Sequence, residues 1–516
     1  MIKNFKWLFL VSLTFVACNN NEDVTTDANS SDGLPLTSGS ANFSKYVALG
    51  NSLTSGYSDG ALFIEGQKGA YPALLAQQFA LIGGGDFTTP FMADNVGGFK
   101  VGGTVASGPR MYFNGSAPVP VSGTPSTEIL THLTGPFNNM GVPGAKSFHL
   151  LSNTYGNPAG IGTYANPYFV RFASSTSATV LGDATAQNPT FFSLWIGNND
   201  VLAYATSGGT GVNQTGNMNP ATYGGNDITD PNVFASVYNT LINGLTANGA
   251  KGVVSNIPYV TSVPFFTTVP TNPIPGLPSA SAAQLNQLFG AINQITTALG
   301  QPNRFATIVA DDNNPATTEK NPLLINDESL PNLSTFITGA LTPALGAATA
   351  GYVGNLYGRA KHASNVPATR DYILLTAQSV IGTTQSGAPS PFNTVGVSYP
   401  MQDSTTLTAA ETAEVVAATN AYNTTIQSLA AAKGLAFVNA NTIMAQVANS
   451  GMAYNGYTMT STYVTGNAFS LDGVHPSPKG YALIANKFIE AINATYGSNL
   501  RGPDLGGYRI LFPATL

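Results

Sequence analysis

Short apolar segments of strand type alternate along this chain with longer segments of helical type, and no other feature constrains the fold as strongly. The strand-type segments lie at 45–50, 190–196, 252–257, 371–375 and 435–438. The helix-type segments lie at 70–83, 233–245, 283–299, 409–432 and 479–496. Because strands that alternate with helices pair in parallel, the sequence predicts an α/β fold with a mainly parallel sheet.

The segment at 409–432 carries the clearest helix signals. Thr408 and Glu411 have the spacing of a capping box, in which each side chain satisfies a free backbone amide of the other. Apolar residues then recur at helical intervals, namely Val415, Tyr422, Ile426 and Leu429. We expect this face of the helix to cover the sheet.

Three long stretches rich in Gly, Pro, Thr and Asn interrupt the alternation, at 84–137, 203–230 and 258–370. None shows a repeat of fixed period. We interpret them as long loop insertions in one domain that spans 43–500, with 501–516 as a C-terminal tail. Aromatic and apolar residues at 259–266 wall an acyl pocket, form a lid or belong to the core.

Charged residues are scarce, and acidic residues outnumber basic ones. The 516-residue chain has 19 Lys and Arg against 25 Asp and Glu, while 43% of its residues are hydrophobic. A globular protein is therefore expected. Nucleic acid is not expected as a partner, because no basic surface is available to neutralise phosphates.

The N-terminus resembles an export signal. Lys3 and Lys6 precede an apolar run at 7–17 that is too short to span a bilayer. Cys18, the single cysteine, follows at once, and Phe15-Val16-Ala17-Cys18 resembles a bacterial lipobox, although Phe15 replaces the usual Leu. We therefore expect a signal peptide at 1–17, and a lipidated Cys18 that anchors an exported protein to the outer membrane or cell surface. The alternative is an ordinary structural cysteine beside a cleavage site. The polar stretch 18–42 is expected to be a flexible tether.

Four separated segments carry groups suited to chemistry. Gly50-Asn51-Ser52 follows the first strand, and Gly197-Asn198-Asn199-Asp200 follows the strand at 190–196. The other two are 139–144 (NMGVPG) and 472–476 (DGVHP). Ligands of open α/β sheets bind outside the carboxyl ends of the strands, so we expect these segments to meet there.

In this order, the four segments resemble the sequence blocks of the SGNH (GDSL-like) hydrolases. Asn51 replaces the usual Asp of the GDSL motif, and Pro143 replaces a common small residue. The resemblance implies a flavodoxin-like, three-layer fold and a serine esterase or lipase, here in a lipoprotein form with large insertions. It also implies an oxyanion hole made by the backbone N–H groups of Ser52 and Gly144 and the side-chain amide of Asn199.

The residue types fit nucleophilic catalysis. A serine hydroxyl needs an adjacent base, and His475 is suited to take the proton of Ser52. Asp472 lies where it can orient the other ring nitrogen of His475 and stabilise the imidazolium. We therefore expect Ser52, Asp472 and His475 to form a catalytic triad that hydrolyses lipid acyl esters or carbohydrate acetyl esters. A surface lipoprotein that keeps this fold as a binding module without useful turnover is the alternative.

Simpler interpretations of the same residues remain open. Ser52 is also a typical helix N-cap, Asn199 and Asp200 fit a turn that closes a strand, and 472–476 fits a capped loop. Ser58 is a rival nucleophile because 56–60 matches the G-x-S-x-G elbow, although no strand runs directly into it.

The other histidines, His132, His149 and His362, are expected to be surface or hydrogen-bonded residues. No His or Cys spacing predicts a metal site, and we expect no cofactor.

Overall fold

A computed structural model describes residues 27–516, so the predicted signal peptide and Cys18 lie outside the described residues. Its centre is a parallel sheet of five strands with the order β15-β8-β7-β1-β6. The strands are β1 (Tyr46–Gly50), β6 (Asn139–Gly141), β7 (Phe191–Trp195), β8 (Lys251–Ser255) and β15 (Ala436–Val438). The predicted α/β fold with a mainly parallel sheet is confirmed.

One strand of the central sheet differs from the prediction. The segment 371–375 contributes β13 (Tyr372–Ile373), which pairs antiparallel with β14 (Thr406–Leu407) outside the central sheet, because Ile373 packs in a separate apolar cluster. The fifth strand of the sheet is instead β6, which lies within a segment predicted only to carry functional groups. With three residues and a glycine at its end, β6 has no strand-type pattern of its own.

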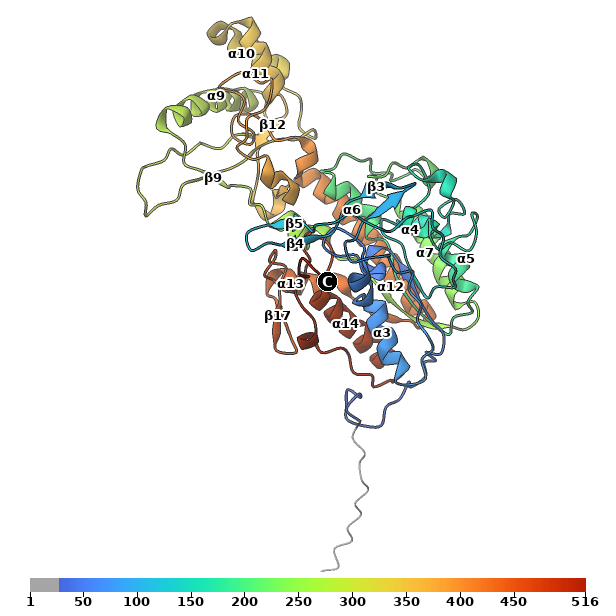
Figure 1. The fold of residues 1–516 in the computed structure, drawn as a ribbon. Coiled ribbons are helices and arrows are strands. Elements are labelled where there is room, and N and C mark those ends of the chain that lie inside the picture. The colour runs from blue at the N-terminus through green and yellow to red at the C-terminus, as the bar shows by residue number, and fades with distance from the viewer. Residues whose placement is uncertain (1–26) are drawn as a thin grey trace, which may run out of the picture.

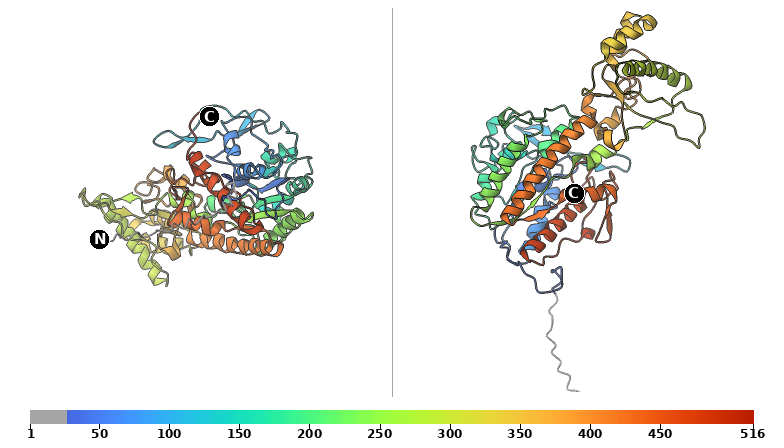
Figure 2. Two further views of the ribbon diagram at one scale, coloured as in Figure 1. Left: turned by 90° about the horizontal axis from the view of Figure 1, so that it is seen from below. Right: turned by 180° about the vertical axis from the view of Figure 1, so that it is seen from behind.

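Helices cover both faces of the sheet (Figures 1 and 2). On one face α3 (Tyr71–Ala80) packs beside α14 (Pro478–Tyr496), and the rings of Tyr71 and Phe488 are 4.7 Å apart. The other face carries α5 (Val180–Thr185), α7 (Pro231–Thr246) and α12 (Ala409–Lys433). The remaining elements of the body are α1 (Ser52–Ser55), α2 (Ile64–Lys68), α4 (Pro167–Val170), α6 (Asn199–Thr206), α13 (Ala440–Asn449), and the hairpin of β16 (Met452–Tyr454) and β17 (Tyr457–Met459).

The helix α12 forms as its sequence predicts. Thr408 and Glu411 make a capping box, and the helix ends at Gly434 in the left-handed conformation. Tyr422 is fully buried and stacks on Phe234 of α7 at 4.2 Å. The predicted apolar face is therefore confirmed as a core face.

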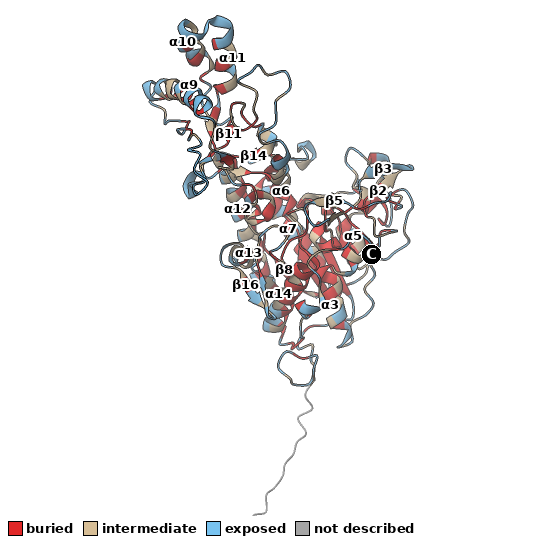
Figure 3. Ribbon diagram, turned by 60° about the vertical axis from the view of Figure 1, so that its left-hand side comes forward, coloured by how far each residue is buried: buried red, intermediate tan, exposed pale blue. Residues whose placement is uncertain are grey.

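The insertion predicted at 258–370 is not a loop, and it extends to about residue 407. It contains α8 (Pro264–Thr267), α9 (Ser279–Ala298), α10 (Ser334–Leu345) and α11 (Ala347–Tyr357), and it projects from the body (Figure 1). Its antiparallel ladders are β9 (Ile274–Pro275) with β10 (Lys320–Asn321), β11 (Leu324–Asn326) with β12 (Ala360–His362), and β13 with β14. Phe289, Phe305 and Tyr357 are buried in an apolar core of the insertion's own. Figure 3 shows buried segments within the insertion, apart from those of the body.

The other two insertions are more irregular. The first, 84–137, forms two hairpins, β2 (Phe99–Val101) with β3 (Thr104–Ser107) and β4 (Met111–Phe113) with β5 (Pro118–Pro120). A small cluster that includes Leu62, Phe99 and Tyr168 holds it to the body. The second, 203–230, contains the end of α6 and is otherwise mostly turns.

Both ends of the described chain are packed rather than free. Within the predicted tether, residues 27–42 lie against the end of α14, where Asn499 accepts from Thr37 N (2.8 Å) and donates to Asp32 (2.9 Å) and Pro35 O (3.1 Å). Within the predicted tail, the carbonyl of Pro513 accepts from buried Arg110 (2.7 Å). The prediction of a flexible tether does not hold from residue 27 onward, because hydrogen bonds to residues 496–501 fix this polar segment, and composition does not reveal them. No helix in the range 27–516 is long and apolar enough to cross a bilayer.

Asn499→Ala is expected to release 27–42 from the body. The substitution removes three hydrogen bonds made by a buried side chain, at a cost of about 1–3 kcal/mol. Limited proteolysis followed by mass spectrometry should show faster cleavage within 27–42, whereas Thr495→Ala, at an exposed position nearby, should behave as the wild type. Equal cleavage of both variants would contradict the packing role of Asn499.

Candidate active site

The strand order places the candidate site at one point of the sheet. Numbered along the chain, the five strands are arranged 2-1-3-4-5, so the connections that leave β1 and β7 run in opposite directions from neighbouring carboxyl ends. A crevice opens at such a switch point in doubly wound sheets. Ser52 follows β1, and Asn198 and Asn199 follow β7, so both segments border this crevice.

Ser52 is the first residue of α1, and Asn51 is its cap. The Asn51 side chain accepts from Leu53 N (3.0 Å) and donates to Asn198 Oδ1 (3.1 Å). The N-cap of α1 is therefore Asn51 and not Ser52, so the Ser52 hydroxyl remains available for other contacts. The amide at 51 has a local role, because an ionised carboxylate in its place would have no proton to donate to Asn198.

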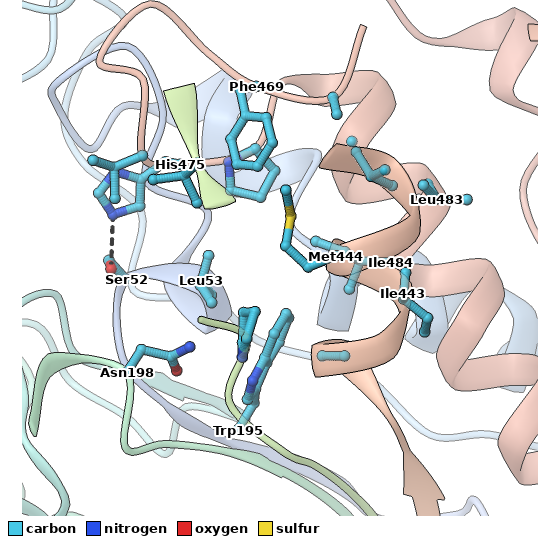
Figure 4. A pocket seen from close by; sticks show the side chains of 18 of the residues that line it. Ser52, Leu53, Trp195, Asn198, Ile443, Met444, Phe469, His475, Leu483 and Ile484 are labelled. Atoms are coloured by element: carbon cyan, nitrogen blue, oxygen red, sulfur yellow. Dashed lines mark hydrogen bonds between the residues drawn. The ribbon is translucent and has the colours of Figure 1, made fainter. Parts of the chain in front are cut away.

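Three predicted side chains form one hydrogen-bonded series. His475 Nε2 lies 2.8 Å from Ser52 Oγ (Figure 4), and His475 Nδ1 lies 2.9 Å from Asp472 Oδ2. The carboxylate only accepts, so the ring holds its proton on Nδ1 and presents the lone pair of Nε2 to the serine hydroxyl. This arrangement is suited to removal of the Ser52 proton.

The Asp472 carboxylate is held ionised by its surroundings. Burial alone raises the pKa of such a group, but the charge and hydrogen bonds of His475 outweigh burial and lower the pKa of Asp472 to about 2. Backbone N–H groups of Val474 and His475 also donate to Oδ1, at 2.9 and 2.8 Å. Stability from these contacts is present above pH 4 and is lost as the pH falls toward 2.

The turn at 56–60, which contains Ser58, supports the loop that carries Asp472. Ser58 Oγ donates to Pro476 O (3.1 Å), not to a histidine, which argues against Ser58 as a nucleophile. Asp59 accepts from Leu471 N (2.9 Å), and its own N–H donates to Ser470 Oγ (3.0 Å). Gly60 N donates to Asp472 Oδ2 (3.0 Å). The sequence analysis did not predict that this turn supports the Asp472 loop. The only signal is the polar pair Ser58-Asp59.

The predicted oxyanion donors are partly brought together. Asn199 Nδ2 donates to Ala145 O (2.9 Å), so the segment 197–200 is joined to the residue that follows Gly144. The second N–H of the Asn199 amide remains available. Among the described hydrogen bonds, neither Ser52 N nor Gly144 N has a protein acceptor. Asn199 lines the cavity beside Ser52, whereas Gly144 does not. Asp200 is structural, since its carboxylate accepts from Ser147 N and Oγ at 2.8 and 2.7 Å.

Asn198 also lines this cavity, and sequence reasoning did not single it out. Its side chain lies near Ser52 (Figure 4), where its Oδ1 accepts from Asn51. Two adjacent asparagines after a strand left no sequence signal to separate their roles.

The other histidines have structural contacts, as predicted. His132 Nε2 lies 2.8 Å from Ala173 O. Burial lowers the pKa of His149 to about 3 and that of His362 to about 4, and each accepts a backbone N–H through Nδ1. Neutral, hydrogen-bonded rings of this kind are ordinary parts of a core.

An apolar cavity of about 130 Å³ adjoins Ser52. Its polar end is formed by Asn51, Ser52, Asn198, Asn199 and His475. Side chains of α13 and α14, among them Met444 and Ile484, form much of its wall (Figure 4). Further apolar lining comes from Leu53, Trp195, Val260, Val263, Val438, Ile443, Val447, Phe469, Leu483 and Phe488. Of the segment 259–266, Val260 and Val263 line the cavity, whereas Phe266 packs in the core and does not line it.

Carboxylates that could share a metal ion lie elsewhere. Among the described residues, they group as Asp311, Asp312 and Glu319, and as Glu328, Asp403 and Glu411. None of these residues lines the cavity. Comparisons of the chain with protein-family models, with curated proteins and with solved structures found no match.

Asp59→Asn is expected to flatten the pH dependence of stability. Burial, together with the nearby charge of Asp472, raises the pKa of Asp59 to about 7, although the Leu471 N–H opposes the shift. The folded chain then binds a proton that the unfolded chain has released, so stability falls as the pH rises from 4 to 7, by up to about 4 kcal/mol.

Denaturant unfolding across this pH range measures the effect. In Asp59→Asn, the free energy of unfolding should decrease less between pH 4 and 7 than in the wild type. Asp86→Asn, at an exposed position, should show the same decrease as the wild type. Parallel curves for wild type and Asp59→Asn would show that Asp59 does not titrate in this range.

Proposed function

We propose that this chain is a serine esterase of the SGNH (GDSL-like) type that hydrolyses carboxylic esters through an acyl-enzyme on Ser52. The observation that carries the proposal is the series Ser52, His475 and Asp472, with separations of 2.8 and 2.9 Å. Nucleophile, base and orienting carboxylate in this geometry are the parts that acyl transfer requires.

The fold supports the same assignment. The order 2-1-3-4-5 is that of flavodoxin-like doubly wound sheets, in which ligands bind at the switch point. Helices on both faces of the sheet also support the proposal, because the SGNH resemblance implies a three-layer fold.

In the proposed first step, Ser52 Oγ attacks the ester carbonyl carbon while its proton moves to His475 Nε2. The carbonyl π electrons move to oxygen, and the resulting oxyanion needs hydrogen-bond donors that are already in place. Ser52 N, Gly144 N and the Asn199 amide are the proposed donors. The imidazolium then gives its proton to the departing alkoxide, which leaves as the alcohol.

In the second step, water replaces the alcohol. His475 accepts a proton from the water as it attacks the acyl carbon, and the tetrahedral intermediate expels Ser52 Oγ. The proton on Nε2 returns to Ser52, and the carboxylic acid is released. Asp472 remains ionised throughout and stabilises each imidazolium.

The cavity favours an ester with an apolar acyl group. Apolar cavities of about 150 Å³ bind benzene, so a space of about 130 Å³ is suited to a chain of roughly six carbons. Each methylene buried contributes about 0.8 kcal/mol. An acetyl group leaves most of this surface without contact, so lipid-type acyl esters are the proposed substrates rather than acetylated sugars.

Lipid anchoring through Cys18 stays a prediction. An anchored enzyme would act beside its membrane, where acyl esters are concentrated. Metabolic labelling with a fatty acid should therefore mark the wild-type chain and not Cys18→Ser.

Ser52→Ala is expected to lower kcat for acyl esters by about 10⁴-fold or more, because the acyl-enzyme cannot form. A fluorophosphonate should label the wild-type chain but not Ser52→Ala, while Ser58→Ala should still be labelled. Absence of both labelling and hydrolysis across short-chain, long-chain and acetyl-sugar esters would instead support a binding module.

Met444→Trp is expected to shift the acyl preference toward short chains. The indole would fill space near α14 that a longer acyl chain needs, so kcat/KM for a roughly eight-carbon ester should fall about tenfold or more while that for an acetyl ester stays within about twofold. Gln446→Trp, at an exposed position on the same helix, is the matched control. An unchanged chain-length profile in Met444→Trp would exclude the cavity as the acyl site.

A further inference from the structure

Three carboxylates meet where the insertion joins the body. Glu328 follows β11 in the insertion, Asp403 lies near the end of the insertion, and Glu411 lies in the first turn of α12. Each offers an oxygen, and these oxygens all lie within 4.8 Å of one another. Like charges at this spacing repel, and water can screen the exposed Glu328 but not the buried Glu411.

Glu411 is buried with an unsatisfied oxygen. Only 4% of the residue is exposed, and its Oε2 accepts from Thr408 N and Thr408 Oγ1. Its Oε1 has no hydrogen-bond donor, and the Glu411 carboxyl group can hydrogen-bond to that of Glu328 only through a shared proton. Of nine such buried atoms among the described residues, four are oxygens between 403 and 412, including Asp403 Oδ1. Buried carboxylate oxygens without donors are costly unless a ligand supplies positive charge.

Basic side chains beside the cluster make other contacts. Arg359 Nη1 donates to the backbone carbonyl of Glu328 (2.7 Å), not to its carboxylate. Among the described residues, no lysine or arginine makes an ion pair with the three carboxylates. The nearby Lys361 pairs instead with Asp327 and Asp371, at 3.0 Å each.

The segment of the body that directly follows α6 lies against Glu411 and Asp403. The backbone of Gly209 lies so near the Glu411 carboxylate that a Cβ there would be 1.9 Å from Oε1. Gly208 approaches the backbone carbonyl of Asp403 in the same way. The C-terminal end of a helix carries partial negative charge, which also favours a cation.

We propose that Glu328, Asp403 and Glu411 bind a divalent cation of the calcium class, which ties the insertion to α6 and α12. Hard oxygen donors of this kind suit Ca²⁺, whose bonds of about 2.3–2.6 Å allow ligand oxygens to be up to about 5 Å apart. Mg²⁺ prefers shorter bonds and stricter geometry, so it fits less well. Without a cation, burial and the neighbouring Glu328 raise the pKa of Glu411 and of Asp403, so protons would compete for the site.

Calorimetric titration of Ca²⁺ into the chelator-treated chain tests the proposal, with thermal unfolding as a second readout. The wild type should bind one Ca²⁺ and unfold at a higher temperature when Ca²⁺ is present. Glu328→Gln combined with Asp403→Asn should weaken binding roughly tenfold or more and abolish the thermal shift. Both substitutions lie outside the buried cap of α12, so folding should survive.

Asp312→Asn is the matched control. It alters the exposed carboxylate group at 311–319, and Ca²⁺ binding and the thermal shift should be unchanged. Equal loss in this variant would assign the effect to the exposed group and overturn the proposal. A wild-type chain that Ca²⁺ does not stabilise, but that acidification does, would overturn it in favour of shared protons. This test does not depend on the proposed ester hydrolysis.

Discussion

The carboxylate of Asp472 joins the first and last parts of the sheet domain, and the candidate site depends on this junction. It accepts from Gly60 N, 412 residues earlier in the chain, and from the His475 ring and two backbone amides of its own loop. These contacts hold the Asp472 loop and the His475 ring in the position from which His475 Nε2 reaches Ser52 Oγ. A neutral amide at 472 would accept fewer bonds and present a donor where an acceptor is needed.

The large insertion leaves this junction intact because of where it enters the chain. It interrupts the connection from β8 to α12, whereas the switch point lies between β1 and β7. Its base nevertheless lies next to the candidate triad, since Val263 lines the cavity and Phe265 N donates to Gly473 O (2.9 Å). The insertion is therefore positioned to influence the shape of the cavity without supplying a member of the triad.

Sequence patterns predicted the features that depend on local spacing. The capping box of α12, four strands of the sheet and the neighbours Asp472 and His475 all have short-range signals. Features that depend on distant contacts were missed. They include the three-residue β6, the separate core of a Gly- and Pro-rich insertion, the packing of 27–42, and the support that Asp59 gives to Leu471. In each case, the partner lies far away in the chain, and composition alone does not reveal it.

The helix α14 connects the candidate base with the wall of the cavity. Its N-cap Ser477 directly follows the loop of His475, and the hydroxyl of Tyr481 donates to Tyr57 O (2.7 Å), beside α1. One turn further on, Leu483 and Ile484 line the cavity. The candidate base therefore directly precedes the helix that forms part of the cavity wall, and the packing of α14 helps to set the position of both relative to Ser52. In the proposed reaction, an acyl chain held by this wall would place its carbonyl carbon near Ser52 Oγ before attack, so that little orientational entropy is left to lose in the transition state.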